Sequence, residues 1–251
     1  MSTDWPEGYG RQVLAETDST NAEAARQAHA LAGPTWILAL HQSAGRGRRG
    51  RPWCDPPGNF AATLVMRPAE APALVALRSF VASLALLEAL SRVTGRVGAF
   101  ALKWPNDVLL NGGKVAGILL ESLGGGGGRV AHLAIGIGVN LKSAPAPHEL
   151  EEGALRPVSL LSEAGVAVSA EEFLDILAPA YARWEGRFTT YGFAPVREAW
   201  LARAARLGEA ITARTGTESI TGIFETVDAA GNLVLSTPKG RQAIAAADVF
   251  F

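Results

Sequence analysis

Four apolar segments of strand length follow one another in the middle of the chain, and they limit its possible folds more than any other feature. They cover residues 100–104, 107–110, 114–122 and 130–141. Asn111-Gly-Gly-Lys114 joins the second segment to the start of the third, and this sequence is typical of a tight hairpin turn. Because a hairpin joins antiparallel strands, the sequence predicts a sheet with a run of antiparallel strands.

Segments with helical periodicity lie on both sides of these strands. Thr20-Asn-Ala-Glu23 has the spacing of a capping box and opens an Ala-rich amphipathic stretch to about residue 32. Ser19 and Thr20 are therefore expected at a helix N-terminus. Two longer helices and two more strands are expected, the helices at 72–94 and 170–204 and the strands at 35–41 and 60–66. We therefore expect an α/β (α+β) fold with a mixed, largely antiparallel sheet flanked by helices.

The pattern changes after about Arg206. Short apolar runs alternate with turn sequences such as Asp228-Ala-Ala-Gly-Asn232 and Pro238-Lys-Gly240. This pattern predicts a small C-terminal β-barrel of about 45 residues. We therefore expect two domains, a larger one over residues 1–205 and a small β domain over residues 206–251.

The composition is that of a packed globular protein. Of 251 residues, 48% are hydrophobic and 19% are charged, and the formal net charge is −1. A nearly neutral chain is unlike a protein whose whole surface follows nucleic acid, although a local basic patch lies at residues 46–51. Cys54 is the single cysteine, which excludes an intramolecular disulfide and a multi-cysteine metal site.

Targeting signals are not evident in the sequence. The N-terminus has neither a basic region nor an apolar one of the secretory type. The most apolar stretch, around residues 79–90, is expected to be too short to span a bilayer. We therefore expect a cytoplasmic protein without a membrane partner.

The strongest local signal is the loop Ala44-Gly-Arg-Gly-Arg-Arg-Gly-Arg-Pro-Trp53. It places four arginines and three glycines between two predicted strands. Glycine lets a backbone approach a ligand closely, and guanidinium groups pair with phosphate or carboxylate. On this stretch alone, three interpretations stay open: a site for a polyanion, an Arg-Gly segment that binds RNA, and a solvated basic loop.

Three further segments carry polar groups at strand ends. Lys103-Trp-Pro-Asn-Asp107 exposes an amide and a carboxylate, although Asn106 and Asp107 could simply close an Asx turn. Lys114 begins an apolar strand and could hold a phosphate, or it could be a hydrated charge. Ile135-Gly-Ile-Gly-Val-Asn140 lacks the last glycine of a dinucleotide fingerprint, so its glycines indicate something packed closely on the strand.

The cysteine and the histidines suggest no further chemistry. Cys54 has no histidine neighbour in the sequence, and we treat it as incidental. The four histidines lack the spacing of a zinc site.

Five blocks taken in order give a family resemblance. They are Glu16-Thr-Asp-Ser-Thr-Asn21, Gln42-Ser-Ala-Gly-Arg-Gly-Arg-Arg-Gly-Arg-Pro-Trp53, Lys103-Trp-Pro-Asn-Asp107, Lys114-Val-Ala-Gly-Ile118 and Gly136-Ile-Gly-Val-Asn-Leu141. Together they closely resemble the biotin protein ligases. The resemblance implies a class II synthetase-like catalytic domain and an SH3-like C-terminal barrel. It also disfavours the RNA interpretation of the arginine loop, because the other four blocks have no place in it.

The resemblance implies biotin–[acetyl-CoA-carboxylase] ligase activity with biotin and ATP as substrates and Mg²⁺ as cofactor. The biotin carboxylate would attack the α-phosphorus of ATP, so the site needs positive charge to offset repulsion. The product, biotinoyl-5′-AMP, would pass biotin to a lysine of a biotin carboxyl carrier protein. Because this mixed anhydride reacts with water, we expect residues 44–53 to fold over it and to be mobile without ligand.

The same resemblance assigns residues to roles. Lys114 and Arg48 would be catalytic, and Asp107 would either orient the attacking amine or hold water on Mg²⁺. The biotin-binding residues would be Ser19, Thr20, Asn21, Gln42, Arg46, Gly47, Arg48 and Lys114. The nucleotide-binding residues would be Arg51, Trp53, Lys103, Asn106, Asp107 and Asn140.

Two rival functions and two possible assemblies stand beside this assignment. A lipoate or octanoate ligase would use a related fold, and a biotin sensor would bind the vitamin without turnover. The arginine loop favours biotin, and Lys103, Lys114 and Arg48 argue against a sensor. An exposed sheet edge could pair with a second subunit, giving a homodimer, or with the acceptor domain. Only about 15 residues precede the first block, so we expect no helix-turn-helix and no DNA partner.

Overall fold

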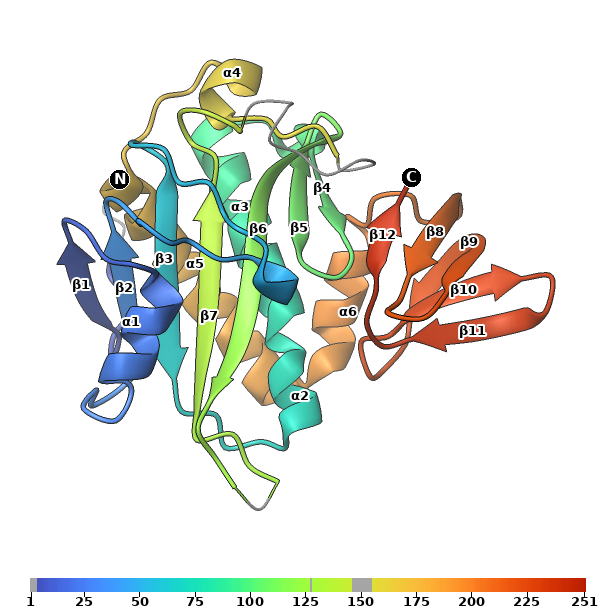
Figure 1. Cartoon of the computed structure of the whole chain (residues 1–251), viewed down its shortest axis with the longest axis horizontal. Coiled ribbons are helices and arrows are strands. Elements are labelled where there is room, and N and C mark those ends of the chain that lie inside the picture. Colours follow the sequence, from blue (N-terminus) through green and yellow to red (C-terminus); the bar gives the residue numbers. More distant parts are fainter. Residues whose placement is uncertain (1–3, 127, 146–154) are drawn as a thin grey trace.

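The computed structural model describes residues 4–126, 128–145 and 155–251. A seven-stranded sheet forms the larger part of the molecule, and a separate five-stranded sheet stands beside it (Figure 1). The order of the large sheet is β1-β2-β3-β7-β6-β5-β4. Its strands are β1 Gly10–Leu14, β2 Thr35–Ala39, β3 Phe60–Met66, β4 Phe100–Lys103, β5 Asp107–Leu110, β6 Gly113–Leu123 and β7 His132–Val139.

Strand pairing confirms a mixed, largely antiparallel sheet. β1 and β2 are parallel, and the other neighbouring pairs are antiparallel. The turn between β5 and β6 is the expected one, with φ of 49° at Asn111 and 80° at Gly112. β1 is not predicted from the sequence, and it forms one edge of the sheet. Whether that edge pairs with another chain stays a prediction.

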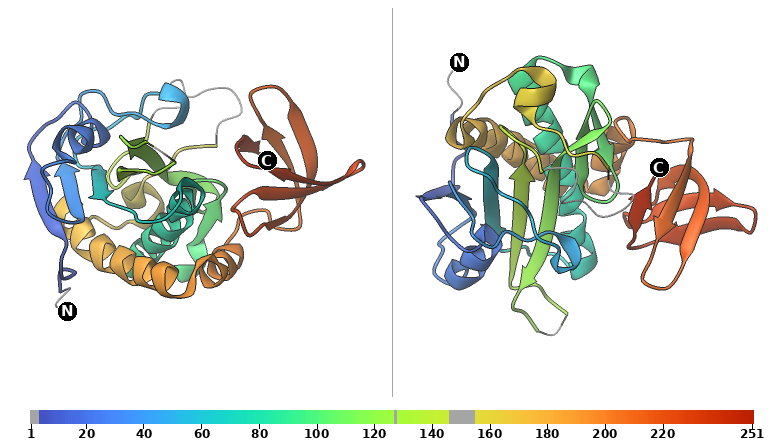
Figure 2. Two further views of the ribbon diagram at one scale, coloured as in Figure 1. Left: turned by 90° about the horizontal axis from the view of Figure 1, so that it is seen from below. Right: turned by 45° about the horizontal axis from the view of Figure 1, so that its top comes forward.

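Helices cover both faces of the sheet. The helices are α1 Thr20–Gln27, α2 Pro72–Ala76, α3 Arg78–Thr94, α4 Leu160–Ala164, α5 Ala170–Tyr191 and α6 Phe193–Leu201, with 3-10 turns η1 Arg48–Gly50 and η2 Val97–Ala99. The long helices α3 and α5 pack together behind the sheet, whereas α1 lies in front of it (Figures 1 and 2). Because long helices cover the back face, the described residues leave the front face of the sheet open for a site.

Three expected helices differ in detail. The first ends at Gln27 instead of residue 32, and its N-cap is Ser19 with no side-chain capping bond, so the capping box at Thr20 was wrong. The Thr20 hydroxyl instead donates to Gln42 Oε1 and accepts from Thr63 Oγ1. The stretch 170–204 is broken at Gly192, which has φ of 73°. The stretch 72–94 divides into α2 and α3 at Leu77.

The expectation about membrane spanning needs a correction. Pro72–Thr94 is long and apolar enough to cross a bilayer by length and composition, so the expectation that the apolar stretch is too short was wrong. Most of this segment is buried inside the protein, and Phe80, Leu86 and Leu90 belong to the central hydrophobic core. Its apolar character is therefore accounted for by packing against the sheet and α5.

The C-terminal sheet packs on the edge of the larger unit. Its strands are β8 Ala210–Arg214, β9 Ser219–Val227, β10 Leu233–Thr237, β11 Gly240–Ile244 and β12 Asp248–Phe250, in the order β11-β10-β9-β8-β12. All pairs are antiparallel, consistent with the expected SH3-like domain. Trp104 Nε1 donates to the carbonyl oxygen of Gly231 at 3.0 Å, and Arg197 donates to Thr226 Oγ1 at 3.0 Å. These contacts fix β12 beside the front face.

Candidate active site

A cavity of about 680 Å³ opens on the front face of the large sheet. Its walls come from α1, the loop 44–53, strands β5 to β7 and the C-terminal strand β12. In Figure 1 the loop crosses in front of β7 and β6 as a blue segment that contains η1. Every predicted site residue lines this cavity: Ser19, Thr20, Asn21, Gln42, Arg46, Gly47, Arg48, Arg51, Trp53, Lys103, Asn106, Asp107, Lys114 and Asn140.

The end of the cavity next to α1 is neutral and hydrogen-bonded. Gln42 Oε1 accepts from the Thr20 backbone N–H at 2.8 Å and lies 3.1 Å from Thr20 Oγ1. Thr63 Oγ1 lies 2.8 Å from Thr20 Oγ1 and 2.6 Å from Asn21 Oδ1. All four side chains are buried. Fixed amides and hydroxyls of this kind suit a polar, uncharged ligand group.

Alternating glycines bring side chains down onto the sheet. An added Cβ at Gly136 would lie 2.3 Å from Asn21 Oδ1, and one at Gly138 would lie 2.5 Å from Trp53 Cε2. An added Cβ at Gly117 on β6 would lie 3.2 Å from Trp53 Cζ3. The expectation of close packing on these strands is therefore confirmed, and the packed groups are the amide and the indole that line the cavity.

The opposite end of the cavity is charged. Lys114 Nζ lies 2.8 Å from Asp107 Oδ1, and Lys103 Nζ lies 3.6 Å from Asp107 Oδ2. The β4–β5 hairpin pairs Lys103 with Asp107, and β5 pairs with β6, which carries Lys114. Antiparallel pairing thus brings three charges from three strands together. Lys114 Nζ also lies 5.7 Å from the centre of the Trp53 ring.

Burial and charge oppose each other at this cluster. Burial would raise the pKa of Asp107, but Lys114 and Lys103 hold that pKa below its ordinary value. Burial lowers the pKa of Lys103, against the effect of Asp107, which raises it. Asp107 therefore stays ionised at neutral pH, and one carboxylate faces two ammonium groups.

The arginine loop is tied to the C-terminal strand. Asp248 Oδ2 lies 2.8 Å from Arg49 Nη1 and 2.9 Å from Arg51 Nη2, and Asp248 Oδ1 lies 3.6 Å from Arg48 Nη1. Arg48 also donates to the carbonyl oxygen of Ala247 at 3.3 Å, and burial lowers the pKa of its guanidinium. The expected mobility of residues 44–53 without ligand stays a prediction, and it requires these ion pairs to break.

Asn140 presents an unsatisfied acceptor at the cavity. Its Nδ2 donates to the carbonyl oxygen of Val158 at 3.0 Å, whereas Oδ1 is buried and has no partner among the described residues. An unpaired buried oxygen is costly unless a ligand supplies a donor. Asn140 is therefore suited to accept from an N–H or O–H of a bound molecule.

Four polar residues at or behind the cavity are not predicted from the sequence. Asp248 lines it, and Thr63 lies behind Thr20 and Asn21. Glu121 accepts from Asn21 Nδ2 at 2.6 Å, and Asp55 accepts from the Gln42 backbone N–H at 3.0 Å. Burial raises the pKa of Asp55. The chain carries no local signal for these residues, because each contacts its partner only after distant segments come together.

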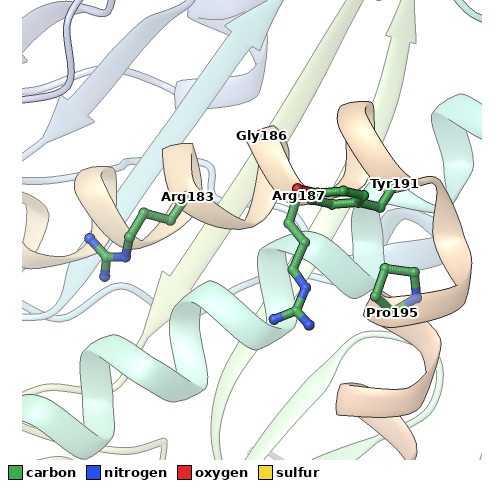
Figure 3. A pocket seen from close by; sticks show the side chains of 5 residues that line it. All are labelled: Arg183, Gly186, Arg187, Tyr191 and Pro195. Carbon is green, nitrogen blue, oxygen red and sulfur yellow. The ribbon is translucent and has the colours of Figure 1, made fainter.

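Cys54 and a second hollow are two further features of the described surface. Cys54 is exposed at the cavity wall, and the described residues hold no cluster of three or more His, Cys, Asp or Glu side chains able to bind a metal. A second hollow lies on the helical side, lined by side chains of α5 and α6 (Figure 3). There, Arg183, Arg187 and Tyr191 face open solvent, and the hollow is separated from the front face by the sheet.

The front cavity joins a neutral, hydrogen-bonding end to a strongly cationic end. Such an arrangement suits a ligase that binds a polar organic acid and activates its carboxylate with a nucleotide. The model of the Biotin/lipoate A/B protein ligase family matches residues 11–140, and that of the Biotin protein ligase C terminal domain matches residues 207–251. The chain belongs to the biotin/lipoate A/B protein ligase family.

Individual relatives agree with this membership. The chain is 61% identical over 239 residues to the biotin--[acetyl-CoA-carboxylase] ligase of Paracoccus denitrificans, covering 95% of this chain and 99% of that protein. It is 31% identical to the bifunctional ligase/repressor BirA of Bacillus subtilis, covering 94% of this chain and 71% of that protein. The biotin protein ligase from Aquifex aeolicus in complex with biotin and ATP superposes with a TM-score of 0.83 at 26% identity, covering 96% and 98%.

Proposed function

We propose that the protein activates biotin with ATP to biotinoyl-5′-AMP and transfers biotin to a lysine of a biotin carboxyl carrier domain. The observation that carries this proposal is the single cavity with a neutral hydrogen-bonding end and the Lys114–Asp107–Lys103 cluster at the other. The name of the Paracoccus relative and the bound biotin and ATP of the Aquifex structure support the same substrates.

In the first step an oxygen of the biotin carboxylate bonds to the α-phosphorus of ATP, and the bond to pyrophosphate breaks. Both reactants are anionic, so the site must offset their repulsion. Lys114 and Arg48 are the proposed catalytic residues, since both are cations that line the cavity. Asp107 holds Lys114 in place through the 2.8 Å ion pair, and we assign it this positioning role.

The two ends of the cavity divide the remaining roles. The proposed biotin-binding residues are Ser19, Thr20, Asn21, Gln42, Arg46, Gly47, Arg48 and Lys114. The proposed nucleotide-binding residues are Arg51, Trp53, Lys103, Asn106, Asp107 and Asn140. Asn140 supports this division because its unpaired Oδ1 can accept from the nucleotide, and the Trp53 indole offers an aromatic face.

Magnesium enters this proposal as part of the substrate MgATP. The Asp107 and Asp248 carboxylates are both engaged with lysines or arginines, and the described residues offer no set of three metal-binding side chains. Mg²⁺ is commonly held by substrate phosphates and water together with one or two carboxylates. The bound ion would add positive charge to the phosphates, while the protein cations position them.

In the second step the neutral amine of the acceptor lysine attacks the mixed anhydride, and AMP leaves. No nucleophile from the enzyme is required for this exchange, and we assign no role in it to the free Cys54. The proposed partner is a biotin carboxyl carrier domain, and the proposed location is the cytoplasm. The domain division at residues 205 and 206 falls between α6 and β8 and belongs to the same proposal.

The test is to incubate the purified protein with MgATP and either biotin or lipoate, and to measure pyrophosphate release and labelling of a carrier domain. Biotin-dependent release together with labelling is the expected result. Biotin binding without pyrophosphate release would indicate a sensor. A response to lipoate alone would show that the substrate is lipoate and not biotin, since the name of the matched family includes lipoate ligases.

A further inference from the structure

The charged end of the cavity stands on the short turn between β4 and β5. Lys103 is the last residue of β4 and Asp107 is the first residue of β5, with Trp104, Pro105 and Asn106 between them. Trp104 is 3% exposed and is not among the residues that line the cavity. Because Trp104 follows Lys103 directly and lies three residues before Asp107, a group that holds its side chain also helps to hold both charged residues.

The indole of Trp104 is held by the C-terminal sheet. Its Nε1 donates to the carbonyl oxygen of Gly231 at 3.0 Å, in the turn Asp228–Asn232 between β9 and β10. The Asp228 carboxylate accepts from two backbone N–H groups of this turn, at 2.8 and 2.9 Å, and from Asn232 Nδ2 at 2.9 Å. A turn closed by three bonds to one carboxylate presents the Gly231 carbonyl in a fixed direction.

Gly231 fits closely against the start of α3. Its φ is 84°, and an added Cβ would lie 2.7 Å from Leu77 Cδ2 and 3.1 Å from Phe80 Cε2. Both of these side chains are buried, so they have little room to move aside. The missing side chain at position 231 therefore lets the turn come near enough for its carbonyl to accept from Trp104.

Two further bonds hold the β4–β5 turn from other sides. Ser79 Oγ, on α3, donates to the carbonyl oxygen of Pro105 at 3.0 Å. Asn106 Nδ2 donates to the carbonyl oxygen of Ile118, on β6, at 2.5 Å. The turn is thus tied to α3, to β6 and, through Trp104, to the C-terminal sheet. A shift of the C-terminal sheet against the large sheet would act on the turn through the Trp104 bond.

We infer that Trp104 and Gly231 are positioning residues, through which the C-terminal sheet sets the place of the charged cluster at the β5 end of the cavity. This inference rests on the proposed function, in which that cluster binds and activates the nucleotide. A displaced turn moves Lys103 and Asp107, and Lys114 follows because it is paired with Asp107 at 2.8 Å. The neutral end stands on α1 and β3, so it should keep its geometry.

Gly231→Ala tests the inference, with Gly208→Ala as its matched control. The new methyl group at position 231 should push the turn away from Leu77 and from Trp104. We expect the KM for ATP to rise about fivefold and kcat for pyrophosphate release to fall about fivefold, with the Kd for biotin within about twofold of wild type. Gly208 has nearly the same φ, 82°, but no atom within 4 Å of an added Cβ. Gly208→Ala therefore carries the backbone strain alone and should leave all three values near those of the wild type.

Trp104→Phe is a milder second variant, because it keeps an aromatic ring and removes the N–H. It should lower kcat/KM for ATP about tenfold and leave biotin binding unchanged. Trp5→Phe is its control, since Trp5 Nε1 also donates to a backbone carbonyl, that of Tyr9 at 2.7 Å, outside the cavity. Both changes break one link, so the double variant Trp104→Phe/Gly231→Ala should be no slower than the slower single variant.

The split between the two substrates decides the outcome. Equal losses of ATP and biotin binding in Gly231→Ala would indicate a general loosening of the fold and would overturn the inference. Wild-type kinetics with ATP in both Gly231→Ala and Trp104→Phe would also overturn it. Failure of the wild type to release pyrophosphate with biotin would instead refute the proposed function. Calorimetric binding of MgATP would then still test the inference, because Gly231→Ala should bind MgATP more weakly than Gly208→Ala does.

Discussion

The two ends of the cavity satisfy their polar groups in opposite ways. At the α1 end, the side chains of Thr20, Asn21 and Gln42 are bonded to other protein groups before any ligand arrives. At the β5 end, Asp107 stands between Lys103 and Lys114, so positive charge exceeds negative charge. The neutral end is therefore suited to selecting a ligand by hydrogen-bond direction, and the charged end to binding anions whose charge the protein does not itself balance.

The largest effect is expected from the charged end. Lys114→Ala should lower the rate of adenylate formation by about 10² to 10³-fold, because it removes a cation at the reacting groups. Biotin binding should change much less, since the neutral end remains. Pyrophosphate release and equilibrium biotin binding measure the two effects separately. Lys142→Ala, at an exposed lysine outside the cavity, is the control, and full turnover of Lys114→Ala would remove that residue from the mechanism.

A glycine substitution tests the wall between the two ends. In Gly138→Ala the new methyl group would meet the Trp53 ring at 2.5 Å, so the indole must move. Because Trp53 is a proposed nucleotide-binding residue, displacement of its indole should lower kcat/KM for ATP by about thirtyfold. Gly98→Ala is the control, because no atom lies within 4 Å of its added Cβ. Equal kcat/KM values for the two variants would show that the Trp53 position does not matter.

Asp107→Asn tests how much the charged end contributes to stability. Removing the carboxylate leaves Lys103 and Lys114 facing each other, which should lower the free energy of unfolding by about 2 kcal/mol near neutral pH. The folded pKa of Asp107 lies below its ordinary value of 3.8, so its stabilising contribution is present above that value and is lost as the pH falls through the folded pKa.

Urea unfolding of the wild type and Asp107→Asn at several pH values measures this contribution. The difference between the two proteins should stay constant from pH about 7 to about 5 and shrink only in stronger acid. A difference that had already vanished at pH about 5 would show that the lysines do not lower the pKa of Asp107.

The smallest effect concerns the tie between the arginine loop and the C-terminal sheet. Asp248→Asn removes ion pairs to Arg49 and Arg51 that are partly exposed, so the loop should open about fivefold more often. Trypsin, which cuts after arginine, should then cleave the unliganded protein within residues 46–51 about fivefold faster. Glu225→Gln, which breaks an ion pair to Arg241 away from the cavity, should not change the rate. Identical rates for both variants would contradict the role of Asp248.

Much of the fold could be predicted from local patterns. The hairpin at Asn111 and Gly112 follows from two residues that tolerate positive φ, and the buried strands follow from apolar runs. The failures were also local. The spacing of Thr20 and Glu23 indicated a capping box, but the Thr20 hydroxyl had better partners in Gln42 and Thr63. Tertiary contacts thus overrode a weak local preference.

The residues of the candidate site also fall into those that local sequence identifies and those that it does not. Residues in the ordered blocks, such as Lys114 and Asn140, could be identified because several polar groups in fixed order are a specific pattern. Glu121 and Asp248 could not, since nothing near them in the chain distinguishes them from surface carboxylates. Their partners, Asn21 and Arg49, are distant in sequence and meet them only in the folded protein.

The sequence by itself determined the family resemblance, most of the strands and helices, and fourteen of the residues that line the cavity, because these depend on residue chemistry and short-range order. Only the tertiary structure decided which of those residues form ion pairs and which groups their side chains bind. The ion pairs of Asp107 and the bond between Glu121 and Asn21 depend on strand register and on which segments become neighbours. A turn fixes the register within a hairpin, but packing across the whole sheet decides which separate segments become neighbours, and no local stretch of the chain encodes that choice.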